Sequence, residues 1–179
     1  KSNYYWICLN TSGNGKRMII EPAQNVPDPI VISSFKEKLF YDPEEFSINS
    51  EGNYWFSHRG SNGQSFIWNT SLTGLMQGSD ISYKIRAASR VICPNQNHME
   101  MREENSTMPF YNFNMDCVTV GWDNWIWTGT ASFSINQSQK TNGEQSSVKS
   151  TFYCTSAEGE GYIDWMEIQY QRSLTFVKN

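Results

Sequence analysis

The chain has 179 residues, of which 38% are hydrophobic, 15% aromatic and 18% charged, and its formal net charge is −4. This size and composition predict a single domain over residues 1–179, with enough apolar side chains for a sizeable core. The negative charge argues against binding to nucleic acid, and the absence of an apolar run of about 18 residues argues against membrane insertion.

The chain opens on a strand-like stretch, Tyr4 to Cys8, with no leader before it. This start predicts that the domain is a fragment of a larger secreted protein.

Short stretches in which apolar and polar residues alternate recur along the chain, separated by Gly, Asn, Ser and Pro. A period of two is typical of strands that bury one face. The predicted strands, in chain order, are residues 4–9, 17–20, 38–41, 53–57, 64–69, 81–87, 116–120, 130–135, 148–154 and 162–171. Polar segments 21–29, 94–109 and 136–147 are predicted to be surface loops. Because no helical segments alternate with the strands, we expect an all-β, jelly-roll-like antiparallel β-sandwich of about ten strands.

The closing strand is predicted to be central, since bulky side chains occupy both of its faces. Simple alternation assigns Tyr162, Asp164, Met166, Ile168 and Tyr170 to one face, and Ile163, Trp165, Glu167 and Gln169 to the other. In 81–87 the apolar face is Ile81, Tyr83, Ile85 and Ala87, and in 148–154 it is Val148, Phe152 and Cys154.

The four cysteines are widely spaced, with no Cys-x-x-Cys pair and only two histidines to complete a metal site. They predict two disulfides and an oxidising compartment rather than zinc, and the sequence does not choose among the alternative pairings. The residues are Cys8, Cys93, Cys117 and Cys154. Glycosylation sequons begin at Asn10, Asn69, Asn105 and Asn136, a number close to that expected by chance in a chain rich in Asn, Ser and Thr.

A catalytic nucleophile needs a nearby base, and only His58 and His98 are available. Both are expected to be structural or exposed to solvent, and no Gly-x-Ser-x-Gly, phosphate-binding or His-Glu-x-x-His motif is present, so we expect no enzyme activity. Two acidic stretches, one with Asp42, Glu44 and Glu45 and the other with Glu100, Glu103 and Glu104, are predicted to be solvated turns. Neither has the spacing of a calcium loop, although a structural calcium ion is the alternative; no other cofactor is expected.

The most distinctive local feature is a cluster of tryptophans between Gly121 and Gly129. Exposed aromatic rings stack on sugar rings while Asp, Asn or Arg side chains bind the hydroxyls. The candidate ligand contacts are Trp122, Asp123, Trp125 and Trp127, together with His58 and Arg59. The alternative is that Trp125 and Trp127, which share a strand face, belong to the core.

Three segments carry a further pattern. They are residues 3–7 with Gly15-Lys16-Arg17-Met18, then Phe40-Tyr41 with residues 52–56, 66–68 and 85–90, and finally residues 161–174, which are the most specific. Together they resemble the β-domain that precedes the catalytic domain in gingipain-family cysteine peptidases, among them the sortases of the type IX secretion system. Ser57 and His58 depart from the pattern, which has Gly and Glu there, and the four cysteines lie outside it. The resemblance implies a sandwich module whose family keeps its catalytic Cys and His in a following caspase-like domain.

The leading functional hypothesis is therefore a non-catalytic accessory or binding domain of a secreted or cell-surface bacterial protein, attached to a gingipain-like peptidase. Its partner would be an adjacent domain of the same polypeptide or another surface protein. A carbohydrate-binding jelly-roll module, with a glycan as partner, is the alternative that the tryptophan cluster motivates. A subunit of an extracellular filament or surface layer is a further alternative, because exposed strand edges can pair between molecules.

Overall fold

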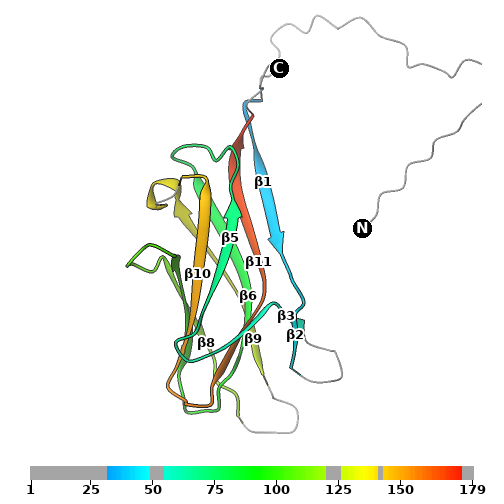
Figure 1. Cartoon of the computed structure of the whole chain (residues 1–179), viewed down its shortest axis with the longest axis vertical. Helices are drawn as coiled ribbons and strands as arrows, with labels where there is room; N and C mark the ends of the chain where they lie inside the picture. Colours follow the sequence, from blue (N-terminus) through cyan, green and yellow to red (C-terminus); the bar gives the residue numbers. More distant parts are fainter. Residues whose placement is uncertain (1–31, 49–54, 120–125, 141–142, 175–179) are drawn as a thin grey trace, which may run out of the picture. The chain divides into compact units, whose positions relative to one another are not determined.

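The computed structural model describes residues 32–48, 55–119, 126–140 and 143–174, which form a β-sandwich (Figure 1). Its strands are β1 (Ser34–Tyr41), β2 (Phe46–Ser47), β3 (Trp55–Phe56), β4 (His58–Ser61), β5 (Ser65–Ser71), β6 (Asp80–Arg90), β7 (Asn97–Glu103), β8 (Tyr111–Met115), β9 (Trp127–Asn136), β10 (Gln145–Cys154) and β11 (Glu160–Ser173). A short 3₁₀ helix, η1 (Gln137–Gln139), follows β9. No helix in the described part of the chain is long and apolar enough to cross a membrane.

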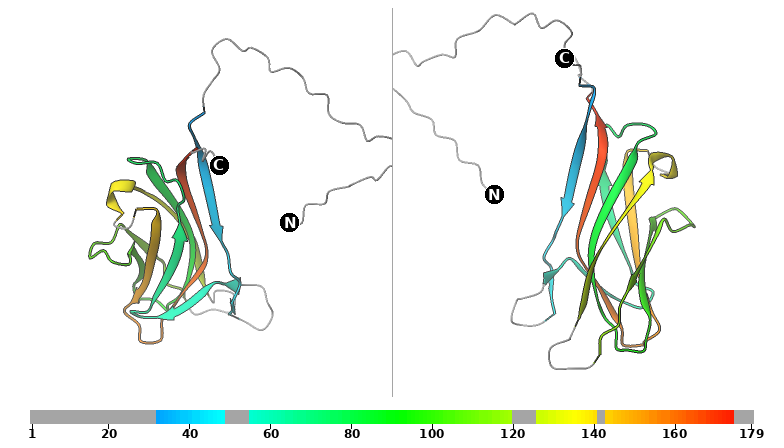
Figure 2. Two further views of the ribbon diagram at one scale, coloured as in Figure 1. Left: turned by 45° about the horizontal axis from the view of Figure 1, so that its top comes forward. Right: turned by 180° about the vertical axis from the view of Figure 1, so that it is seen from behind.

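Two antiparallel sheets face each other in this sandwich (Figure 2). The five-stranded sheet has the order β1-β11-β6-β9. Its fifth strand, β4, pairs with the beginning of β11, along the same edge on which β1 pairs with the rest of β11. The four-stranded sheet has the order β5-β10-β7-β8. A small ribbon of β2 and β3 is the remaining pair. The expected all-β, jelly-roll-like antiparallel sandwich is thus confirmed.

The core lies between the two sheets and follows from the alternation in their strands. The five-stranded sheet contributes Ile81, Ile85, Met166 and Ile168, and the four-stranded sheet contributes Met99, Met101, Val148 and Phe152, all fully buried. Phe152 packs over Gly161 so closely that a Cβ there would lie 2.3 Å from the ring. Any side chain at position 161 would therefore push the two sheets apart at this point.

The predicted central position of β11 is confirmed, because it pairs with β1, β4 and β6. The predicted faces are wrong beyond Ile163, because the register against β6 shifts between Ile163 and Trp165. This bulge inserts Asp164 as an extra residue, so Ile163 and Met166 both point into the core and Trp165 points outward.

The described residues contain most of the predicted strands, with two corrections. Residues 116–120 were expected to form a strand, but within the described residues 116–119 only Val118 pairs, in an isolated parallel bridge with Ile92. Segment 94–109 was expected to be a loop, yet it contains β7, whose buried Met99 and Met101 alternate with His98, Glu100 and Arg102. The outward polar residues concealed the apolar face. Predicted strands 4–9 and 17–20 lie outside the described residues.

One disulfide joins Cys93, just after β6, to Cys117, just after β8, with Cα atoms 5.1 Å apart. Backbone hydrogen bonds from Cys93 N to Val118 O (3.0 Å) and from Val118 N to Val91 O (2.8 Å) hold the same two segments together. Cys154 is half-buried and forms no disulfide within the described residues, and Cys8 lies outside them. A second disulfide stays a prediction.

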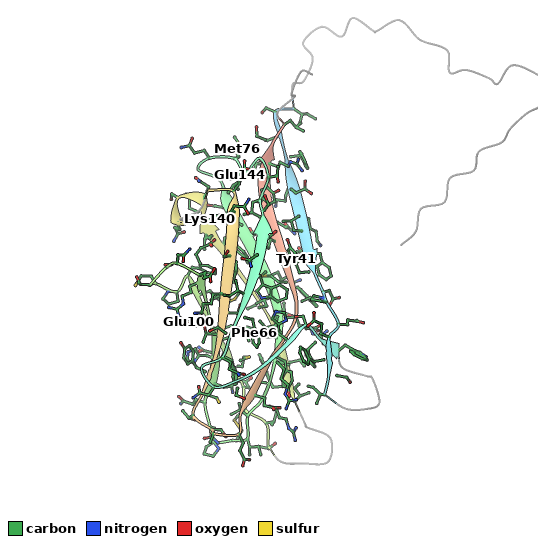
Figure 3. The ribbon with its side chains drawn as sticks, viewed as in Figure 1. Tyr41, Phe66, Met76, Glu100, Lys140 and Glu144 are labelled. Carbon is green, nitrogen blue, oxygen red and sulfur yellow. A yellow bond between two sulfur atoms is a disulfide. The ribbon has the colours of Figure 1, made fainter. Side chains whose placement is uncertain are left out.

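Glu103 corrects the expectation of a solvated acidic turn, since it is 1% exposed at the end of β7. The ammonium of Lys140 (Figure 3), itself buried, donates to Glu103 Oε1 at 2.9 Å and to the carbonyl of Gln145 at 3.1 Å. Ser146 Oγ and the backbone N of Ser147 also donate to the Glu103 carboxylate. Every charge in this cluster has partners, as a buried ion pair requires.

We expect Glu103→Ala to destabilise the sandwich by about 3–5 kcal/mol, because it leaves the buried Lys140 ammonium without its counter-charge. The double variant Glu103→Leu with Lys140→Met removes both charges and should recover most of that loss. Urea unfolding followed by tryptophan fluorescence measures both. If the single and double variants were equally unstable, the packing of the two side chains rather than their charges would be responsible.

Candidate functional site

An open cleft of about 760 Å³ lies where β7 begins and β8 and β10 end. We call it the amide cleft, because Asn and Gln side chains dominate its lining. The lining residues that bear on its chemistry are Asn62, Asn95, Gln96, Asn97, His98, Asn114, Asp116, Tyr153 and Cys154.

Asn97, the first residue of β7, is 5% exposed and lines the cleft. Neither its Oδ1 nor its Nδ2 has a hydrogen-bond partner among the described residues. Leaving a buried polar group unpaired costs about 1–3 kcal/mol. Trp68 Nε1 and Ser150 Oγ also lack a hydrogen-bond partner among the described residues, but neither residue lines the amide cleft. The Asn97 side chain therefore carries a buried amide that no described residue satisfies.

On the opposite face of the sheet from the Asn97 side chain, the rings of His98 and Tyr153 stack with centroids 5.2 Å apart and planes tilted by 24°. The two residues are register partners on β7 and β10, and Asn114 faces His98 from β8. All three side chains lie on the outer face of the four-stranded sheet, since Met99, Phe113 and Phe152 occupy the inner face. The result is an aromatic surface with an exposed amide next to it.

Cys154 is not arranged as a nucleophile activated by His98. Cys154 follows Tyr153 in the strand and pairs with Asn97, so its side chain points to the opposite face of the sheet from His98. Its Sγ lies against the core and donates to the carbonyl of Ser156 at 3.1 Å. The cleft thus offers hydrogen bonds and ring contacts, not an activated thiol.

Hydrogen bonds fix the loops that form the cleft walls. Asn95 Nδ2 donates to the carbonyl of Ile92 at 2.8 Å, and Thr155 Oγ1 donates to Asn95 Oδ1 at 3.2 Å. Asn62 Oδ1 accepts from the backbone N of Cys154 at 2.9 Å. Together with the Cys93–Cys117 disulfide, these bonds preorganise the walls.

The electrostatics of the amide cleft favour a neutral ligand. Asp116 is the one carboxylate among the residues that line it, and no Lys or Arg lines it. A neutral molecule with many hydroxyl or amide groups fits this lining better than an anion.

Within the tryptophan cluster, Trp122, Asp123 and Trp125 lie outside the described residues. Trp127 begins β9, is half-buried and packs against the core, with its ring edge-on to Phe113 at 5.7 Å. The Trp127 ring packs directly over Gly129, since a Cβ added at Gly129 would lie 2.2 Å from that ring. Ligand binding by the tryptophan cluster therefore stays a prediction.

The two other predicted ligand residues, His58 and Arg59, make separate contacts within the fold. The ring of His58 stacks on Trp68 with centroids 4.7 Å apart, and its Nδ1 contacts the carbonyl of Ser57. Arg59 is exposed and pairs with Glu160. Burial raises the pKa of Glu160, but hydrogen bonds from Tyr162 and Arg59 outweigh it, so the pKa lies below its usual value. His58 has a packing role, and Arg59 holds β4 to β11.

Sequence reasoning missed the amide cleft, although the run Asn95-Gln96-Asn97-His98 was a signal for it. No group of three or more His, Cys, Asp or Glu side chains that could hold a metal is found among the described residues. Of the sequons, Asn69 and Asn105 are exposed. The Asn136 amide instead caps η1, accepting from Ser138 N and donating to Gly78 O.

No protein-family model matches the sequence, and no curated protein matches it either. Among solved structures, the chain resembles the dimeric latent PorU from Porphyromonas gingivalis, with a TM-score of 0.57 and 11% identity over 82% of this chain. The chain spans 13% of the length of PorU. At this identity the similarity is one of fold.

Weaker similarities connect the chain to two carbohydrate-binding modules. One is the CBM36-1 domain of a multidomain xylanase from the hindgut metagenome of Trinervitermes trinervoides, with a TM-score of 0.42 and 9% identity over 80% of this chain and 100% of that one. The other is a family 35 module from Clostridium thermocellum, with a TM-score of 0.42 and 15% identity over 76% of this chain and 98% of that one.

We expect Asn97→Leu to leave the free energy of unfolding unchanged or to raise it by about 1 kcal/mol. Leucine has the same branching and removes a buried amide that has no partner among the described residues. Thermal and urea unfolding measure the change. Asn95→Leu is the control, because it breaks the hydrogen bonds to Ile92 and Thr155 and should destabilise. A loss of more than about 1 kcal/mol in Asn97→Leu would show that the amide is satisfied within the fold.

Proposed function

We propose that this chain is a non-catalytic β-sandwich domain of a larger secreted or cell-surface protein, and that it binds a neutral saccharide in the amide cleft. The observation that carries the proposal is the stacked pair of His98 and Tyr153 rings, with the exposed Asn114 amide next to it, in a cleft lined by further Asn and Gln side chains.

The chemistry of the cleft matches that of a sugar. Each sugar hydroxyl is both a donor and an acceptor, and each Asn or Gln side chain offers the complementary pair of groups. The C–H face of a pyranose ring packs on an aromatic surface such as Tyr153 with His98. The exposed Asn114 amide, which faces His98 from β8 on the same outer face, is placed to bind a hydroxyl of a sugar on these rings.

A titration of neutral oligosaccharides tests the site by calorimetry, after a glycan array has selected the tightest ligand. We expect Tyr153→Ala and Asn114→Ala each to weaken binding about tenfold, the usual effect of losing a ring contact or a hydrogen bond at a preorganised site. The matched control is Asn112→Ala, which changes the same residue type on the same exposed face of β8 outside the cleft. Equal affinity in all variants, or no binding at millimolar sugar, would contradict the proposal.

A second candidate function is that of an accessory domain attached to a gingipain-like peptidase. The fold similarity to PorU and the resemblance in residues 161–174 favour it. The gene sequence beyond Asn179 tests this. We expect it to encode a caspase-like α/β domain with a Cys and His pair, and a stop codon directly after Asn179 would contradict the attachment. Either result leaves the saccharide titration informative.

A further inference from the structure

The outer face of the five-stranded sheet carries a second candidate binding surface, whose charge and residue types differ from those of the amide cleft. We call it the basic face and define it by the outward side chains of Lys36, Lys38, Phe40, Lys84, Arg86 and Trp165. Their outward placement follows from the register: Phe40, Glu167 and Lys84 form one row across β1, β11 and β6, while Leu39, Ile168 and Ile85 point to the core.

The charge of this face opposes that of the chain. Over the outward positions of Lys36–Phe40, Ser82–Arg86 and Asp164–Gln171, four cations face two carboxylates, whereas the whole chain has a net charge of −4. Both carboxylates are paired, Asp164 with Arg86 at 2.9 Å and Glu167 with Lys38 at 2.5 Å. The hydrogen bond from Lys38, with one from Gln169, lowers the pKa of Glu167 and keeps it ionised. Lys36 and Lys84 form no salt bridge in the described part of the chain, although Lys84 lies near enough to Glu167 to help lower the pKa of that carboxyl.

Trp165 supplies an aromatic surface in the middle of this charge. Its ring lies 5.7 Å from that of Phe40, which is 52% exposed, and the two planes are tilted by 40°. The Lys84 ammonium lies 5.7 Å from the Trp165 ring centroid. A ring stacked on Trp165 would therefore bring its substituents within reach of a cation that forms no salt bridge of its own.

Hydroxyl and amide groups continue the surface across the sheet. A shallow hollow of about 290 Å³ lies next to Lys84 and is lined by Ser82, Ser132, Ser134, Glu167 and Gln169. The Ser82 and Ser134 hydroxyls are 3.0 Å apart, so they already hold each other in place. Such groups bind sugar hydroxyls, and neighbouring lysines bind carboxylates.

The distribution of charged side chains along the strands indicates on which side of Trp165 an anionic group would bind. Asp42 and Glu44, which follow β1, act with burial to raise the pKa of Asp164 against the effect of Arg86, so negative charge gathers at the Asp164 side of Trp165. Lys84 and Lys38 lie on the other side, towards Gln169, where two lysines face a single outward carboxylate, that of Glu167. An anionic group therefore belongs on the Lys84 side of the tryptophan.

From this arrangement we propose that the basic face binds an acidic oligosaccharide of the uronic acid class, with one sugar ring on Trp165 and the carboxylate of that or the next residue at Lys84 and Lys38. This site is separate from the amide cleft and takes a ligand of opposite electrostatic character. The proposal depends neither on attachment to a peptidase nor on the binding of a neutral saccharide in the amide cleft.

Calorimetric titration with oligogalacturonate at low salt tests the site. We expect Trp165→Ala to weaken binding about tenfold, and Lys84→Gln to weaken it about threefold to tenfold and to reduce the dependence of affinity on salt. Fully methyl-esterified oligogalacturonate, which has the same backbone without charge, should bind at least about tenfold more weakly than the acid. Circular dichroism and the melting temperature check that each variant is folded.

The matched control is Lys149→Gln, which removes a lysine from the outer face of the four-stranded sheet. It should leave the affinity for oligogalacturonate unchanged, as should Tyr153→Ala in the amide cleft. Equal weakening by Lys84→Gln and Lys149→Gln would reduce the effect to net charge and overturn the proposal. So would equal affinity for the acid and its methyl ester, or no binding of the acid at low salt. Loss of binding in Tyr153→Ala would instead move the ligand to the amide cleft.

Discussion

The extra residue in β11 at Asp164 sets the outward chemistry of the five-stranded sheet. Because side chains alternate along a strand, adding one residue reverses every later position. Without the bulge, Trp165, Glu167 and Gln169 would point at Phe152 and Met99, and Met166 and Ile168 would point to solvent. The Arg86–Asp164 ion pair occupies the inserted position. The inserted residue that directs Met166 and Ile168 to the core therefore also places Trp165 on the same outer face as Phe40 and Lys84.

The two proposed surfaces differ because different parts of the sandwich build them. The basic face lies on regularly paired strands, so its specificity depends on which side chains share a row, as Phe40, Glu167 and Lys84 do. The amide cleft lies at strand ends, where loops held by the Cys93–Cys117 disulfide carry amides at positions that no ladder hydrogen bond determines. Loops of this kind commonly carry binding residues on a rigid scaffold. A charged polymer suits the first surface, and a compact neutral ligand suits the second.

Alternation in the sequence was sufficient to predict the sandwich, the central position of β11 and the buried face from Ile81 to Ala87, because each depends on a local period of two. It was insufficient for β7, where His98, Glu100 and Arg102 made a half-buried strand look like a loop, and where Glu103 is buried through a partner 37 residues away. The bulge at Asp164 was equally invisible, since both registers place large side chains on both faces. The amide cleft assembles four separated segments, and no single segment displays it.

The two ends of β7 differ in whether their buried polar side chains have hydrogen-bond partners. Asn97 and Glu103 begin and end the same strand, and both side chains are directed inward and are almost fully buried. Around Glu103 the chain supplies Lys140, Ser146 and Ser147, so even a full charge is satisfied. Around Asn97 the described residues supply nothing to a neutral amide, which is far easier to satisfy. The Glu103 end of β7 therefore stabilises the fold, whereas its Asn97 end leaves a buried amide unsatisfied at the cleft for which we propose a ligand.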